Sequence, residues 1–153
     1  MIAESTIDRT LDRLENSGED YEDQIRDFAE SQPELMEYLT NEDVEAFTES
    51  ERELLLFAAL VIYQSVDDER AGISEVSGDD IAAAEERNYE IMAGSRAGNL
   101  RDRLTPFFED SEEEELLAFV EDLTLAEDDE NTVSQEAREP FFVTLKTVID
   151  TLT

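Results

Sequence analysis

Cysteine and histidine are both missing from this chain, and Lys146 is its single lysine. The absence of thiols excludes disulfide bonds, and the absence of both types excludes zinc sites built on thiolate or imidazole groups. A nucleophile activated by histidine is excluded too, as are the glutamate–histidine pairs of diiron helical bundles. No other nucleophile–base spacing stands out, and no glycine-rich phosphate loop precedes a helix. We therefore predict no catalytic residue and no cofactor, and we expect a protein that is not an enzyme.

Long hydrophobic runs are also missing. The longest one, residues 54–63, is about half of the roughly 20 apolar residues that span a bilayer. The first residues, MIAESTIDRT, are acidic and polar, and they lack the basic start and apolar run of a secretory signal. We therefore expect a cytoplasmic protein without a membrane partner.

Positive charge is scarce. The 153 residues include 43 Asp and Glu against 11 Lys and Arg, for a formal net charge of -32. This composition resembles that of cytosolic proteins from salt-accumulating microbes. At roughly 1 M salt the Debye length is about 3 Å, so neighbouring carboxylates stop repelling one another while the chain stays soluble. The same negative charge argues against direct binding of nucleic acid or of an anionic membrane.

Apolar residues recur at helical spacing along most of the chain, and no alternating run is long enough to predict a strand. The sequence therefore predicts an all-α fold, with residues 1–153 in one domain of about six to eight helices. The helix expected at about residues 49–66 is apolar on nearly all sides, which is typical of the central helix of a bundle.

Serine and glutamate pairs predict where two helices begin. Ser50 and Glu53 have the spacing of a capping box at the start of the central helix, and Ser111 and Glu114 have the same spacing further along. A short helix that contains Ala97, Leu100 and Leu104 is expected to end before Pro106.

A weak internal repeat is visible. ELLLF at residues 53–57 resembles ELLAF at residues 115–119, and each segment runs into an acidic loop that a further helix follows. The repeat suggests a duplicated helix–loop–helix unit at about residues 53–92 and 115–152. The alternative is coincidence in a chain with few residue types.

Acidic loops are the first candidate site. Carboxylates gathered in one loop could bind Ca²⁺ or Mg²⁺, which both prefer oxygen ligands. Neither loop fits the calcium-loop pattern. In the first loop, for example, position 12 counted from Asp67 is Gly78, where the pattern needs a glutamate. The simpler interpretation is a solvated loop without a bound ion. The candidate metal ligands are Asp67, Asp68, Glu69, Asp128, Asp129 and Glu130.

An arginine-rich segment at residues 92–108 is the second candidate. It has Arg96, Arg101 and Arg103 against a single acid, Asp102. Arginine suits carboxylates and phosphates, so the segment could form a docking surface; the alternative is pairing with the chain's own acids. On a continuous helix Arg96 and Arg103 would share a face, with Arg101 turned inward. The predicted partner-binding residues are Arg96, Arg103, Phe107 and Phe108.

The functional expectation is a non-enzymatic protein–protein interaction or regulatory module with an unidentified protein partner. A homo-oligomer is left open. The first alternative is a module that binds a divalent cation through its acidic loops. The second is a nucleic-acid-mimicking decoy that presents Asp8, Asp12 and Glu15 on one helix face to a basic partner.

Overall fold

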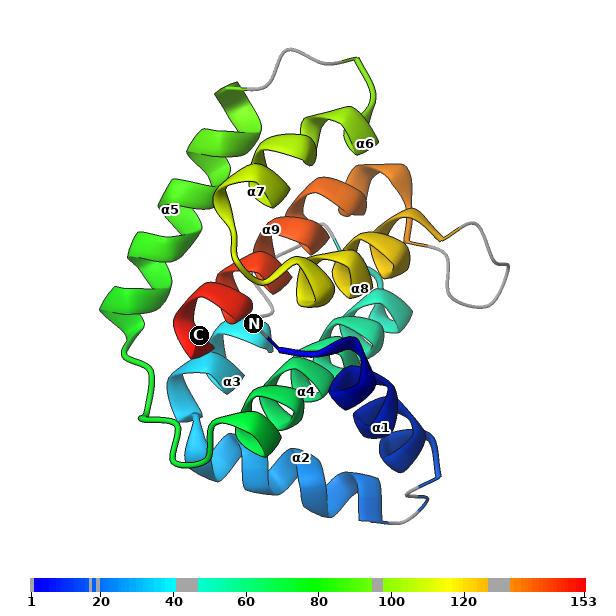
Figure 1. The fold of residues 1–153 in the computed structure, drawn as a ribbon, viewed down its shortest axis with the longest axis vertical. Coiled ribbons are helices and arrows are strands. Elements are labelled where there is room, and N and C mark those ends of the chain that lie inside the picture. The colour runs from blue at the N-terminus through cyan, green and yellow to red at the C-terminus, as the bar shows by residue number, and fades with distance from the viewer. Residues whose placement is uncertain (1, 17, 19, 41–46, 95–97, 127–132) are drawn as a thin grey trace.

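The computed structural model describes residues 2–16, 18, 20–40, 47–94, 98–126 and 133–153. All the regular secondary structure in these ranges is helical, which confirms the all-α prediction (Figure 1). The helices are α1 (Glu4–Glu15), α2 (Asp20–Ser31), α3 (Pro33–Leu39), α4 (Glu49–Glu69), α5 (Gly78–Gly94), α6 (Leu100–Arg103), α7 (Thr105–Asp110), α8 (Glu114–Leu125) and α9 (Gln135–Leu152). None of the described helices is both long and apolar enough to cross a membrane.

Helices α4 and α9 together form the centre of the bundle. Helix α4 packs against α1, α2, α3 and α9, while α9 also contacts α5 and α8 (Figure 1). The predicted central helix is therefore present, and α9 shares its role: every residue from 141 to 149 is buried. In α4, Leu55, Leu60 and Ile62 are buried, whereas Phe57 is half-buried at the edge of the same core.

The capping box of α4 lies two residues before the predicted one. The Thr48 hydroxyl accepts a hydrogen bond from the Glu51 N–H at 3.2 Å, and the Glu51 carboxylate accepts one from the Thr48 N–H at 2.8 Å. The prediction of Ser50 and Glu53 was wrong because both pairs have capping-box spacing. Thr48 has the extended backbone of an N-cap residue and directly precedes Glu49, the first residue of the helix, so Thr48 is the cap.

The predicted box at Ser111 and Glu114 is also wrong. Helix α8 does begin at Glu114, but the Ser111 hydroxyl accepts its hydrogen bond from the Glu113 N–H. The short helix α6 ends at Arg103, before Pro106, as predicted, and Pro106 itself lies in the first turn of α7. A proline fits there because the first N–H groups of a helix have no partner within that helix.

Two acidic side chains hold the beginning of the described chain. The backbone N–H of Ile2 donates to the Glu113 carboxylate at 3.0 Å, and that of Ala3 donates to the Glu69 carboxylate at 2.7 Å. Ile2 itself is fully buried. Part of the negative charge of this chain is therefore used to satisfy backbone donors between distant segments.

A buried polar cluster lies between α5 and α9. Lys146 is ion-paired with Asp150 one turn later, and its side chain is only 9% exposed. Asn88 of α5 donates to Asp150 at 3.0 Å and to the Thr147 hydroxyl at 3.2 Å. The cluster links the two helices by polar contacts.

The internal repeat stays a prediction. Helix α8 packs directly on α9, whereas α4, its counterpart in the repeat, makes its main contacts with α1 and α9. The corresponding helices of the two segments therefore pack in different ways.

Candidate functional site

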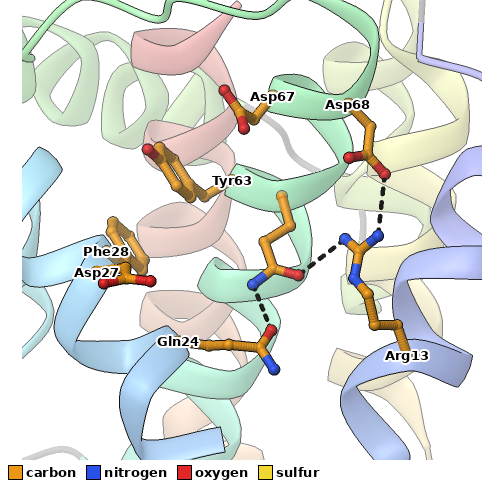
Figure 2. A pocket seen from close by; sticks show the side chains of 8 residues that line it. Arg13, Gln24, Asp27, Phe28, Tyr63, Asp67 and Asp68 are labelled. Atoms are coloured by element: carbon orange, nitrogen blue, oxygen red, sulfur yellow. Dashed lines mark hydrogen bonds and ion pairs between the residues drawn. The ribbon is translucent and has the colours of Figure 1, made fainter. Parts of the chain in front are cut away.

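A polar pocket of about 300 Å³ lies between α1, α2 and α4 (Figure 2). Its walls combine charged, amide and aromatic side chains from three helices. The lining residues are Arg13, Gln24, Asp27, Phe28, Tyr63, Gln64, Asp67 and Asp68.

A chain of hydrogen bonds forms one wall of the pocket. Arg13 of α1 donates to the Gln64 side chain of α4 at 2.9 Å and pairs with Asp68 at 3.4 Å. Gln64 in turn donates to Gln24 of α2 at 2.7 Å. The dashed lines in Figure 2 follow this chain across all three helices. Hydrogen bonds among these side chains therefore connect all three helices along this wall.

Two stacked aromatic rings form the opposite wall. The ring centroids of Phe28 and Tyr63 are 4.9 Å apart, and the ring planes differ by 3°. Phe28 is fully buried, while Tyr63 is half-buried and borders the pocket. Burial on one side leaves the stacked pair little freedom to move, so the pocket has a rigid π-surface.

Two carboxylates of the pocket have no partner among the residues that the structure describes. They belong to Asp27 of α2 and Asp67 of α4, and both residues are exposed. Figure 2 shows Asp67 above Tyr63 in this view and Asp27 below it, beside Phe28. With Asp68, three carboxylates face a single guanidinium, that of Arg13. The pocket therefore attracts cations and offers them hydrogen-bond acceptors that are not already used.

The predicted metal ligands at the end of α4 diverge. Asp68 turns to Arg13, while Glu69 accepts the Ala3 N–H, a hydrogen bond that lowers the pKa of Glu69 below its ordinary value. Within the described ranges, no group of three acidic residues could hold a metal ion. The other candidate ligands, Asp128, Asp129 and Glu130, lie outside the described residues.

The arginine-rich segment is arranged differently from the prediction. Arg103 faces inward, donating to the Met92 carbonyl at 3.1 Å and pairing with Glu139 of α9 at 3.4 Å. Arg101, predicted to be internal, is exposed, and Arg96 lies outside the described residues. The prediction assumed one continuous helix, whereas α6 is a single turn that ends at Arg103.

The aromatic residues predicted beside these arginines belong to the core. Phe107 is fully buried and packs edge-on against Phe142, with ring centroids 5.1 Å apart. Phe108 is half-buried against the same core. Phe107 thus has no exposed surface, and Arg103 directs its guanidinium to Met92 and Glu139.

Sequence reasoning missed the pocket between α1, α2 and α4. Its members come from three helices, so no short motif contains them. A signal was present in α4, where Tyr63, Gln64, Asp67 and Asp68 mark one polar flank of the otherwise apolar helix. The acids of the decoy hypothesis, Asp8, Asp12 and Glu15, are exposed on α1.

Comparison with known proteins adds nothing to this geometry, because no family model, curated protein or solved structure matches the chain.

Proposed function

We propose that this protein is a non-enzymatic interaction module that binds another protein by taking up one of its basic side chains. The supporting observation is the pocket between α1, α2 and α4, where an aromatic wall accompanies the carboxylates of Asp27 and Asp67, which have no partner among the described residues. We place the protein in a salt-rich cytoplasm, on the basis of its acidic composition.

Arginine is the basic side chain that fits best. Its guanidinium is planar, so it stacks on an aromatic face and still donates sideways to carboxylates in its own plane. In the pocket, the face would lie on Tyr63 and the donors would reach Asp27 or Asp67. Lysine offers a compact charge without the flat face, and we expect it to bind more weakly.

The net charge of -32 supports the same proposal. A strongly negative surface accelerates encounters with a basic partner and disfavours acidic ones. At molar salt this attraction is screened beyond a few ångströms, so contacts within the pocket are left to provide selectivity.

The test is the binding of a short acetylated peptide with a central arginine, followed by NMR chemical-shift titration. The comparison peptide carries citrulline, which has nearly the same shape without the charge. We expect the arginine peptide alone to shift resonances of Tyr63 and Gln64. An Asp27→Asn/Asp67→Asn variant should bind at least about tenfold more weakly, since a hydrogen bond to a charged group contributes roughly 1.5–3 kcal/mol.

The matched control is Glu86→Gln/Glu90→Gln, which removes the same charge from two exposed positions of α5. It should retain wild-type affinity. Equal losses in the two double variants would mean that net charge alone attracts the peptide, and the pocket proposal would then be wrong.

A further inference from the structure

A second pocket, of about 370 Å³, lies where α6 meets the end of α8 and the beginning of α9. It shares no residue with the pocket between α1, α2 and α4. Its lining residues are Asn99, Leu100, Arg101, Asp102, Leu125 and Arg138. Two arginines in one pocket stand out in a chain with only 11 basic residues and 43 acidic ones.

Neither of these arginines has a carboxylate partner in the part of the chain that the structure describes. Four other arginines do have one: Arg13, Arg26, Arg70 and Arg103 all form ion pairs with aspartate or glutamate. With acids so abundant, pairing is the expected outcome for an arginine in this chain. What sets Arg101 and Arg138 apart is that two guanidiniums without a carboxylate partner among the described residues line the same pocket.

Local hydrogen bonds prepare the pocket for an anion. The Nε of Arg138 donates to the Val133 carbonyl at 3.2 Å, which fixes the stem, and its terminal nitrogens have no partner among the residues that the structure describes. The one carboxylate of the pocket, Asp102, accepts a hydrogen bond from the Asn99 amide at 3.0 Å, and Asn99 also caps the Asp102 N–H at 2.9 Å. Asp102 is thus held by Asn99 instead of neutralising Arg101.

We propose that Arg101 and Arg138 form a binding site for a small organic phosphate. Two guanidiniums match the nearly doubly negative charge of a phosphomonoester, and each can donate two parallel hydrogen bonds to its oxygens. Leu100 and Leu125 supply an apolar surface for the organic part of the ligand. Nucleic acid is disfavoured as the source of the phosphate because the net charge of -32 repels a long polyanion. This site is independent of the proposed binding of a basic partner.

The test uses isothermal titration calorimetry with phenyl phosphate and, separately, with inorganic phosphate. Both should bind, and phenyl phosphate should bind more tightly because its ring can lie on the two leucines. Arg101→Gln and Arg138→Gln should each weaken binding about tenfold or more, as expected for the loss of hydrogen bonds to a charged group. Leu125→Ala should weaken phenyl phosphate alone.

The control is Arg87→Gln on α5. Arg87 is exposed and also has no carboxylate partner among the described residues, but it lies outside the pocket. Circular dichroism of every variant confirms that it is folded. Wild-type binding by Arg87→Gln, with loss in both pocket variants, would support the site. The proposal is overturned if folded wild-type protein binds neither phosphate, or if all three arginine variants lose affinity equally.

Discussion

Glu51 accepts a hydrogen bond from the backbone N–H of Ser134 at 2.7 Å, across 83 residues of sequence. The same carboxylate closes the capping box at Thr48, so one side chain satisfies backbone donors where both α4 and α9 begin. Glu51 is 5% exposed. Burial alone would raise the pKa of Glu51, but the hydrogen bonds from Thr48 and Ser134 outweigh it and lower the pKa below 4.5.

Acid should therefore weaken the junction between these two helices. A carboxyl group whose pKa is lowered by folding stabilises the protein fully above its unfolded pKa, and this contribution disappears as pH falls through the folded pKa. Glu51→Gln should reduce the free energy of unfolding by about 1–3 kcal/mol at neutral pH, because one of the two backbone donors then faces an amide NH₂. The stability of the Glu51→Gln variant should also depend less on pH below about 4.5 than that of the wild type.

Urea unfolding at fixed KCl, repeated at several pH values, measures both effects. Glu53→Gln is the matched control, since Glu53 is exposed two residues further along α4. Equal pH profiles for Glu51→Gln and the wild type would contradict the assignment.

Alkaline titration should reveal Tyr38. Its hydroxyl donates to the Glu85 carboxylate at 2.5 Å. Burial raises the pKa of Tyr38 well above the ordinary 10.0, and the neighbouring negative charge of Glu85 raises it further. Its contribution to stability is then full below pH 10 and is lost as pH rises through the folded pKa. Absorbance at alkaline pH should show one tyrosine that ionises at a higher pH than the others. This transition should be missing in Tyr38→Phe. It should remain in the control Tyr89→Phe, which removes a 40% exposed tyrosine.

Truncation of Leu60 should strongly destabilise the folded protein. Leu60 is fully buried in α4, so Leu60→Ala leaves a cavity and should lower the free energy of unfolding by about 2–5 kcal/mol. Leu54→Ala, at a half-buried position earlier in the same helix, should lower the free energy of unfolding clearly less. Chemical denaturation of both variants tests the order; a larger loss for Leu54→Ala would show that α4 is rotated relative to the described core.

Salt should stabilise the fold. Because most of the carboxylates repel one another, we expect the melting temperature to rise from low salt to roughly 1 M KCl as the Debye length falls to about 3 Å. Melting followed by circular dichroism measures the shift. Near pH 4 many carboxylates are neutral, so the salt effect should shrink there. A melting temperature that does not change with KCl at neutral pH would rule out this form of salt adaptation.

Helix positions were predictable because apolar spacing reports directly on the buried face. Ile7, Leu11 and Leu14 located α1, and the apolar run at residues 54–63 located α4. Helix starts were less certain, since several serine, threonine and glutamate residues had cap spacing and tertiary contacts chose among them. Glu51 also accepts a hydrogen bond from Ser134, a distant residue that no local pattern could indicate.

Both pockets escaped prediction for a related reason. Arg101 of α6 and Arg138 of α9 are 37 positions apart in the chain, and only the folded structure brings them to the lining of one pocket. The charges themselves were visible in the sequence, but whether an arginine is paired or free depends on the packing of helices. Arg101 and Arg103, two residues apart, illustrate this with opposite outcomes.

The burial of Lys146 has a practical consequence for labelling chemistry. As the sole lysine, with its ammonium group held by Asp150 at the α5–α9 interface, it leaves the protein without a readily accessible ε-amine. Reagents that acylate or crosslink amines should therefore scarcely modify the native side chains, and partner mapping calls for carboxylate-directed or photoreactive probes. The rate of any slow acylation of Lys146 would then measure how often α5 separates from α9.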